Sequence, residues 1–369
     1  MHIQKILLVQ LYSNGDCLYA TAVARQIKED FPRCHLTWMI AGFCNNIINE
    51  NPYVDAKRVA DDIRKNDLQQ FLQLSKQVTL EKEQGLWDEV FILQNSGNNF
   101  ANYDGTIRGM IFRAYPRTIT VPVQPVLVLT DAEKNNATTF AQAHQLSRYS
   151  NVILWEFAPQ SGQLKLDFNQ VMTIAQKITS RPDTCIILSS ANRFNASDSI
   201  FDASSLSFRE NAALTHYCTL LIGCSSGITW ISTSSAAKML PMVQLLDDSV
   251  LFLNAPSVDF KRFGMDTSGL IEMTRFSDQT VSDCIEMILK EGMEKAKTTF
   301  HEELPIQFHS TKRIVYNLLC YLQFKAIWKH WRINTGLYGL HPVFIRQFIL
   351  GFIAFPYLFL TNKWRKRNG

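Results

Sequence analysis

Asp16 is the first residue of the chain whose type and position could serve acid–base chemistry. It ends the loop Tyr12-Ser13-Asn14-Gly15-Asp16, which lies between an apolar run at 6–11 and a predicted helix at 17–30. A carboxylate in the loop after a strand faces the crevice where open α/β sheets bind ligands. A transfer reaction needs a base there to take the proton of an attacking hydroxyl. The alternative is that Asp16 only caps the helix that follows it.

A second turn could hold an anion. Gly223-Cys224-Ser225-Ser226-Gly227 joins the apolar run 219–222 to a helix predicted to begin near Ile228. Small residues at such a junction leave backbone N–H groups exposed at the helix start, where the helix dipole favours an anion such as a diphosphate. The alternative is a tight strand–helix connection with no ligand.

Both turns belong to alternating strands and helices, which predict parallel sheets with right-handed crossovers. The apolar runs predict strands at 6–11, 36–40, 90–93, 118–121, 152–157, 184–188, 219–222 and 240–246. Helices are predicted at 17–30, 61–83, 168–179, 281–287 and 313–331. A length of 369 residues favours two domains.

The surroundings of the two turns resemble the family 9 glycosyltransferases, the bacterial lipopolysaccharide heptosyltransferases and their relatives. In the second half, the matching residues are Leu206, Ser207, Glu210, Gly223, Ser226 and Gly227. In the first half, they are Ser13, Gly15, Asp16, Phe31-Pro32 and Asn51-Pro52-Tyr53-Val54-Asp55. Two positions depart from the pattern: Ser225 replaces an aspartate that contacts the transferred sugar, and Trp230 replaces a common histidine.

The resemblance implies an α/β fold of two doubly wound, Rossmann-like domains that face a cleft, the arrangement called GT-B. The expected parts are an acceptor-side domain at 1–147, a nucleotide-sugar domain at 148–303 and a basic, aromatic helical tail at 304–369. It also implies site roles. Asp16 would be the catalytic base, in a loop shaped by Ser13 and Gly15. The donor would contact Lys165, Glu210, Ser225, Ser226 and Gly227, with Ser161 and Gly162 in the same loop as Lys165.

Several candidate binding residues also have a simpler interpretation. A lysine before a helix, such as Lys165, is commonly only solvated. Glu210 could accept hydrogen bonds from a ribose, or only complement the dipole of its helix. Arg108, Arg113 and Arg117 could meet an anionic acceptor, although arginines on a solvated face are commoner.

The implied function is an inverting glycosyltransferase that moves a sugar from a nucleotide-sugar to a lipid-linked glycan, such as a lipopolysaccharide core or capsular precursor. No cofactor is expected, and no metal site, because no His/Cys cluster has metal-ligand spacing. Two alternatives remain: a non-catalytic nucleotide- or glycan-binding protein with a degenerate GT-B fold, and a sugar-nucleotide epimerase.

The charge is unevenly distributed along the chain. Ten basic residues and no acidic ones follow Glu303. The chain up to Glu303 carries the other 27 basic residues and all 33 acidic ones, so its net charge is −6. Aromatic residues interleave the basic tail, and the run 348–360 is uncharged, broken by Pro356 and too short to span a bilayer core. We therefore expect a cytoplasmic protein bound peripherally to the anionic inner face of the plasma membrane, with no nucleic-acid partner. The eight scattered cysteines fit reduced core residues.

Overall fold

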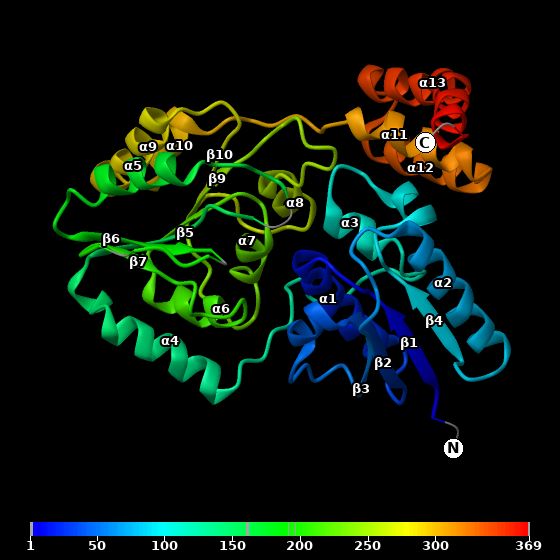
Figure 1. Ribbon diagram of the computed structural model, residues 1–369, viewed down its shortest axis with the longest axis horizontal. Coiled ribbons are helices and arrows are strands. Elements are labelled where there is room, and N and C mark those ends of the chain that lie inside the picture. The colour runs from blue at the N-terminus through cyan, green and yellow to red at the C-terminus, as the bar shows by residue number, and fades with distance from the viewer. Residues whose placement is uncertain (1–2, 160–161, 191, 196, 368–369) are drawn as a thin grey trace.

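The computed structural model describes residues 3–159, 162–190, 192–195 and 197–367. Two α/β domains lie side by side, and a group of helices at the carboxyl end packs beside the first domain (Figure 1). The predicted fold class is thus confirmed.

The first domain is built on a four-stranded parallel sheet in the order β3-β2-β1-β4. Its strands are β1 (Lys5–Val9), β2 (His35–Ala41), β3 (Ala56–Ala60) and β4 (Glu89–Ile92). Its helices are α1 (Asn14–Asp30), η1 (Gly42–Ile48), α2 (Leu68–Glu83), η2 (Gly97–Asn102) and α3 (Ile107–Phe112). Ile6 to Val9 of β1 are fully buried, as expected for a central parallel strand covered on both faces.

The second domain holds a six-stranded parallel sheet in the order β10-β9-β8-β5-β6-β7, which is the doubly wound order of dinucleotide-binding folds. Its strands are β5 (Asn151–Glu156), β6 (Thr184–Ser189), β7 (Ile200–Asp202), β8 (Leu220–Gly223), β9 (Met242–Leu245) and β10 (Leu270–Met273). Its helices are α4 (Asp131–Ala143), η3 (Leu146–Arg148), α5 (Phe168–Ile178), α6 (Glu210–Leu214), η4 (Thr215–Tyr217), α7 (Gly227–Ile231), α8 (Pro256–Arg262), α9 (Asp278–Glu291) and α10 (Met293–Phe300).

One predicted strand is wrong. Residues 118–121 are apolar enough for a strand, but they run as an irregular connection between the domains. The N–H groups of Thr120 and Val121 donate to Oε1 of Gln26, over 2.7 and 3.1 Å, instead of pairing with a strand. A helix side chain thus satisfies the backbone that a sheet neighbour would otherwise satisfy.

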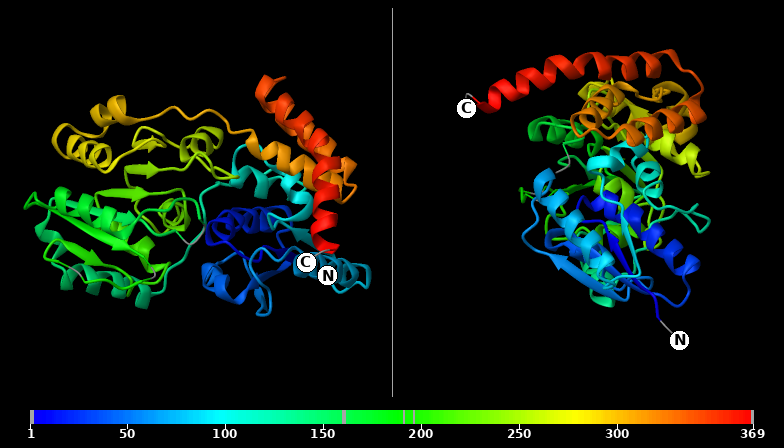
Figure 2. Two further views of the ribbon diagram at one scale, coloured as in Figure 1. Left: turned by 45° about the horizontal axis from the view of Figure 1, so that its top comes forward. Right: turned by 90° about the vertical axis from the view of Figure 1, so that its right-hand side faces the viewer.

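The carboxyl-terminal helices are α11 (His309–Cys320), α12 (Phe324–Tyr338) and α13 (Pro342–Arg367). The continuous helix predicted at 313–331 is wrong, because a turn at Leu322 with a φ of 55° separates α11 from α12. Both helices pack through Ile314, Leu318 and Ile327 on Ala101 and Met110 of the first domain. Figure 2 shows α13 running along the outer side of this helical group. No helix of the described residues is both long and apolar enough to cross a membrane.

A buried ion pair joins the domains. Arg108 of α3 lies 2.9 Å from Oδ1 of Asp259 in α8, and both side chains are fully buried. The Arg108 guanidinium also stacks over the ring of Tyr19, 4.8 Å from its centroid. Such a pair favours one register of the two domains, because a shift that parted the two groups within the interface would leave both charges buried and unpaired.

Candidate active site

Asp16 lies at the point where the strand order of the first sheet reverses. It occupies the first turn of α1, directly after β1, and β4 is the neighbour of β1 on the other side. Oδ2 of Asp16 accepts a hydrogen bond of 3.0 Å from Nδ2 of Asn95, which follows β4. Ligands of open α/β sheets bind at such reversal points. Asp16 therefore lies where the sequence predicts a catalytic carboxylate.

The environment of Asp16 suits a proton acceptor. Burial raises the pKa of Asp16 to about 7, while the hydrogen bond from Asn95 and the charge of Lys65 act in the opposite direction. Asn95 is the only hydrogen-bond donor to this carboxylate within the described part of the chain. The carboxylate thus takes no backbone N–H of α1, and Asp16 as a residue is partly exposed. These observations favour a general base over a helix cap.

The loop that carries Asp16 is held in an unusual conformation. Ser13 precedes α1 with a φ of 72° and makes no side-chain cap. Oε1 of Gln94 accepts hydrogen bonds from the N–H groups of Leu11 and Tyr12, over 2.9 and 3.1 Å. The contacts of Gln94 and Asn95 with this loop could not be read from the sequence, because only the pairing of β1 with β4 brings them here.

The second predicted turn also lies at a reversal point. β5 and β8 are neighbours where the strand order of the second sheet reverses. Glu156 ends β5, and its Oε1 accepts hydrogen bonds from the hydroxyl of Ser226 and, over 3.4 Å, from the N–H of Ile228. A protein carboxylate thus occupies the start of α7, where the sequence predicts a diphosphate.

Glu156 is buried, and only one of its two carboxylate oxygens accepts a hydrogen bond from a described residue. Burial raises its pKa to about 7, although the hydrogen bonds from Ser226, Ile228 and Thr229 lower it. Oε2 of Glu156 has no hydrogen-bond partner among the described residues. The sequence signal for this role is an acidic residue at the end of an otherwise apolar strand.

Ser225 is engaged within the protein. Its N–H donates to Oε1 of Gln244 over 2.8 Å, and its hydroxyl donates to the carbonyl of Asn254. Ser225 is buried and has a φ of 54°. Within the described chain, the N–H groups of Ser226 and Gly227 donate to no residue. These two groups are what the turn can offer to an anion.

The structure brings the two turns together. A Cβ added at Gly15 would lie 3.3 Å from Cδ1 of Trp230 in α7. One added at Gly227 would lie 2.8 Å from Phe208 and 3.8 Å from Cβ of Asn14. The buried Trp230 packs on Tyr19 of α1 with ring centroids 5.1 Å apart. A side chain at Gly227 would thus force Phe208 to shift, one at Gly15 would be tight against Trp230, and α1 and α7 meet at their starts.

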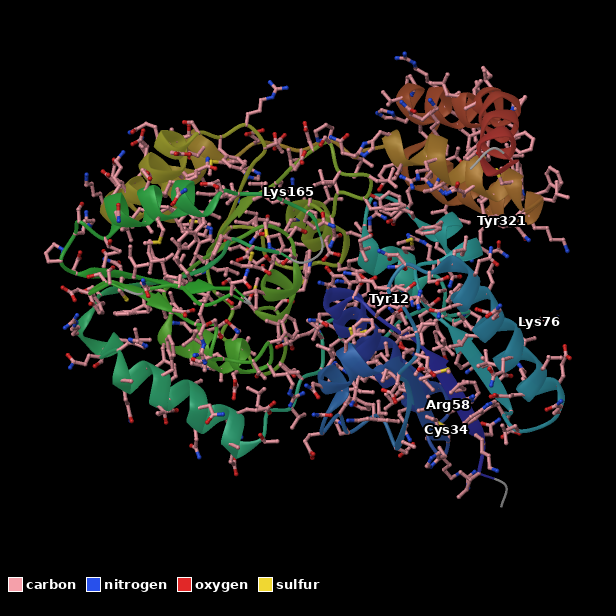
Figure 3. The ribbon with its side chains drawn as sticks, in the orientation of Figure 1. Tyr12, Cys34, Arg58, Lys76, Lys165 and Tyr321 are labelled. Carbon is pink, nitrogen blue, oxygen red and sulfur yellow. The ribbon has the colours of Figure 1, made fainter. Side chains whose placement is uncertain are left out.

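The other predicted donor residues, Glu210, Lys165 and Gly162, lie outside the two turns. Glu210 is buried, and its oxygens accept from the N–H of Ser207 and from Nδ2 of Asn136, both over 2.6 Å. Lys165 is exposed in the loop between β5 and α5 (Figure 3). Gly162 is exposed in that loop with a φ of 71°, and Ser161 lies outside the described residues.

The three candidate arginines bind carboxylates of the protein itself. Arg108 pairs with Asp259, as described above. Arg113 lies 2.7 Å from Asp104, and Arg117 lies 3.7 Å from Asp30. The expectation that they lie on a solvated face is wrong for Arg108, which is fully buried.

Arg209 is a buried residue that sequence reasoning missed. Its guanidinium pairs with Glu133 over 2.5 Å and donates to the carbonyls of Asn46 and Asn49 in the first domain. Arg209 therefore clamps the segment around η1 onto the second domain.

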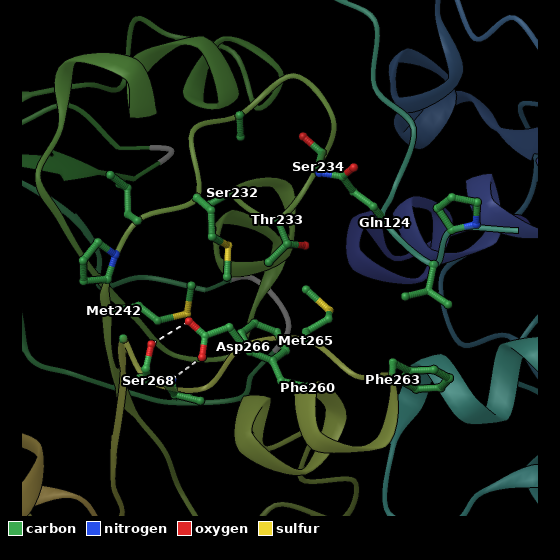
Figure 4. Close-up of a pocket in the computed structure, with 18 of the residues that line it drawn as sticks. Gln124, Ser232, Thr233, Ser234, Met242, Phe260, Phe263, Met265, Asp266 and Ser268 are labelled. Atoms are coloured by element: carbon green, nitrogen blue, oxygen red, sulfur yellow. Dashed lines mark hydrogen bonds between the residues drawn. The ribbon is translucent and has the colours of Figure 1, made fainter. Parts of the chain in front are cut away.

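A cavity of about 860 Å³ lies away from both turns. It is lined by parts of 120–124, 232–242 and 260–270, next to the amino ends of β9 and β10 (Figure 4). Because Asp16 and Glu156 lie at the opposite, carboxyl ends of their strands, this cavity is separate from the candidate active site. Asp266 at its rim is already hydrogen-bonded to Ser268.

Across the described ranges, no group of three or more His, Cys, Asp and Glu side chains could hold a metal ion. All eight cysteines are free thiols, and seven of them are buried.

Comparison with known proteins shows likeness in structure and not in sequence. No protein-family model matches the chain, and no curated protein sequence does. Among solved structures, the family 9 glycosyl transferase of Veillonella parvula is 15% identical with a TM-score of 0.54, covering 88% of this chain and 99% of its own. The E. coli ADP-heptose lps heptosyltransferase II is 14% identical with a TM-score of 0.53, covering 78% and 99%.

A protein provisionally assigned as a UDP-N-acetylglucosamine 2-epimerase, from Listeria monocytogenes, is 10% identical with a TM-score of 0.50, covering 87% and 97%. At such identities the likeness is one of fold. The chain therefore has the two-domain GT-B fold of the solved family 9 glycosyltransferases, as its sequence motifs predicted.

Proposed function

We propose that this protein is an inverting, metal-independent glycosyltransferase that moves a sugar from a nucleotide-sugar to a lipid-linked glycan of the lipopolysaccharide-core or capsule type. The observation that carries the proposal is Asp16, a partly exposed residue at a sheet reversal point whose carboxyl group has a pKa of about 7. A base is most effective when its pKa lies near the working pH. The fold, shared with solved glycosyltransferases, supports the same conclusion.

In this mechanism Asp16 takes the proton of an acceptor hydroxyl. The hydroxyl oxygen forms a bond to the anomeric carbon as the bond to the diphosphate breaks, which inverts the configuration. The leaving diphosphate would be stabilised by the N–H groups of Ser226 and Gly227, with Lys165 supplying a positive charge. Ser225 and Glu210 would support this surface through the contacts that they make within the protein.

One observation speaks against a donor diphosphate at the start of α7. The carboxylate of Glu156 already occupies the start of α7, where it would repel a diphosphate when ionised. A protonated Glu156 removes that repulsion, and its pKa of about 7 makes the neutral form accessible. The catalytic proposal therefore requires Glu156 to be neutral or displaced when donor binds.

Release of nucleoside diphosphate separates these functions. The protein is incubated with a panel of nucleotide-sugars, with and without lipid-linked glycans from a bacterial membrane extract. We expect release that needs the acceptor and falls on the order of 10²–10⁴-fold in Asp16→Asn, because the amide cannot take a proton. The matched control is Asp62→Asn, since Asp62 is exposed.

An Asp16→Asn variant that keeps more than about half of the wild-type rate would make Asp16 a structural residue. Binding of nucleotide-sugars without any release would support the non-catalytic alternative. Turnover of the donor without acceptor would support an epimerase, the assignment given to the Listeria neighbour.

A further inference from the structure

An apolar groove lies between α2 and α11. One wall is formed by Leu68, Phe71, Leu72 and Ser75 of α2, which share a helix face. The other wall is formed by Ile314, Asn317, Leu318 and Tyr321, at the same spacing in and just after α11. Ile92 and the loop from Ser96 to Phe100 also line it, and its volume is about 370 Å³. This size falls in the range of small-molecule sites, about 300–1,000 Å³.

The groove and the candidate active site share the loop that follows β4. Asn95 holds Asp16 through its hydrogen bond of 3.0 Å, and the next two residues, Ser96 and Gly97, line the groove. The same short loop therefore touches both the proposed base and the groove. A molecule whose hydroxyl reaches Asp16 can extend a second part into this groove.

The surface beside the groove is apolar and basic. Tyr321 belongs to the wall and is 49% exposed, and the neighbouring Leu322 and Phe324 are 71% and 61% exposed. Lys325 follows them, and no acidic residue occurs after Glu303. Figure 3 shows Tyr321 and Lys76 of α2 on the same flank of the molecule. Exposed apolar side chains among lysines suit an anionic lipid surface.

The surroundings of the groove favour a lipid over a partner helix, because the wall residue Tyr321 adjoins exposed apolar side chains and Lys325, which suit an anionic lipid surface. A single extended hydrocarbon chain needs only a narrow, apolar slot. We propose that this groove holds the hydrocarbon chain of the lipid-linked acceptor while the glycan of that acceptor reaches Asp16. The inference rests on the proposed function for its acceptor, but the groove can be tested without catalysis.

The test uses a photoactivatable probe, an alkyl phosphate with a diazirine in its chain, presented in vesicles of phosphatidylglycerol. After irradiation of the full-length protein, we expect cross-linked peptides from 68–75, 92–100 and 314–323. Leu72→Arg should lower this cross-linking about tenfold, since a charge in an apolar slot is costly. Leu72→Trp, which fills the slot without charge, should do the same.

Leu80→Arg is the matched control, because Leu80 is a leucine of the same helix, 44% exposed against 38% for Leu72, and does not line the groove. Cross-links confined to 324–353, or equal losses in the Leu72 and Leu80 variants, would overturn the inference. Melting temperatures of all three variants exclude unfolding as the cause.

Transfer assays separate this inference from the proposed function. With truncated lipopolysaccharide and its deacylated form as acceptors, Leu72→Trp should raise KM only for the acylated acceptor. If transfer depends on the acceptor but Leu72→Trp shows equal KM values for the acylated and deacylated acceptors, the proposed role of the groove is wrong and the glycosyltransferase proposal stands. If the probe cross-links in the groove but no acceptor receives a sugar, the glycosyltransferase proposal is wrong and lipid binding in the groove stands.

Discussion

The side-chain amide of Asn95 donates a hydrogen bond to the carboxylate of Asp16 over 3.0 Å, and so joins the loops that follow β4 and β1. The second domain repeats this plan, because Ser226, after β8, donates to Glu156, at the end of β5. Each sheet therefore has a carboxylate with a pKa of about 7 at its reversal point. Burial is the main cause in both cases.

The first prediction concerns the pH dependence of transfer. A general base must be deprotonated, so kcat/KM should rise with pH through about 7, the pKa of Asp16. Asn95 lowers this pKa by donating to the charged form. Asn95→Leu should therefore move the midpoint of the profile to higher pH, measured as nucleoside diphosphate release between pH 5 and 9. Asn169→Leu, an exposed site in α5, should leave the midpoint in place; an unmoved midpoint in Asn95→Leu would argue that another group titrates.

The second prediction concerns stability and Glu156. Its pKa is higher in the folded chain than the ordinary value, so its contribution to folding is fully present below about pH 4.5 and is lost as the pH rises through about 7. Gln stays neutral at every pH. Between pH 5 and 8, the wild type should therefore lose roughly 2–3 kcal/mol of unfolding free energy relative to Glu156→Gln.

Urea denaturation at the two pH values measures this difference. The control Glu291→Gln replaces an exposed glutamate of α9 and should show no comparable change. A constant difference between the wild type and Glu156→Gln at both pH values would mean that Glu156 does not titrate in this range.

Local patterns gave much of the fold and the position of Asp16, whereas contacts between distant segments could not be read from the sequence. The Asp16 loop and the Ser225–Gly227 turn are recognisable because small residues there directly follow apolar strands. The role of Glu156 depends on β5 lying beside β8, a pairing that no local pattern specifies. β3 was missed because partly buried and exposed residues alternate along it and two charged residues, Lys57 and Arg58, interrupt its apolar ones at the edge of the sheet.

The third prediction concerns the domain interface. Arg108→Met should lower the free energy of unfolding by about 3–5 kcal/mol, because it leaves Asp259 buried without its partner. The double variant Arg108→Met with Asp259→Leu should recover much of this loss, since apolar residues can replace a buried pair. Chemical denaturation of the four proteins completes a double-mutant cycle. Additive losses would show that the two side chains do not depend on each other.

The fourth prediction concerns the donor. Ser225 is buried and donates its hydroxyl to the carbonyl of Asn254, so it presents no carboxylate to a sugar. ADP-heptose should therefore not be the preferred donor in the nucleotide-sugar panel, with a charge-assisted bond of roughly 1.5–3 kcal/mol missing. Ser225→Asp should not restore it, because the new carboxylate would face that carbonyl oxygen. Efficient heptose transfer by the wild type at micromolar donor would contradict this expectation.

The fifth prediction concerns peripheral binding to the membrane. Phe324 and Trp328 of α12 are each 61% exposed, beside Lys325 and Lys329. Replacing both aromatic residues with glutamate should weaken sedimentation with phosphatidylglycerol vesicles at least about tenfold, because it removes apolar contact and adds like charge. Raising the salt to about 1 M should weaken wild-type binding too, since the screening length falls to about 3 Å.

Point variants are better suited to this test than removal of α13. Phe344 of α13 is fully buried and packs on Phe308, so truncation after Gly339 would open the helical group. Phe43→Glu is the matched control, because Phe43 is 58% exposed in η1 of the first domain, outside the carboxyl-terminal helices. If the paired variant still sediments with vesicles as the Phe43 variant does, the exposed face of α12 is not the membrane contact.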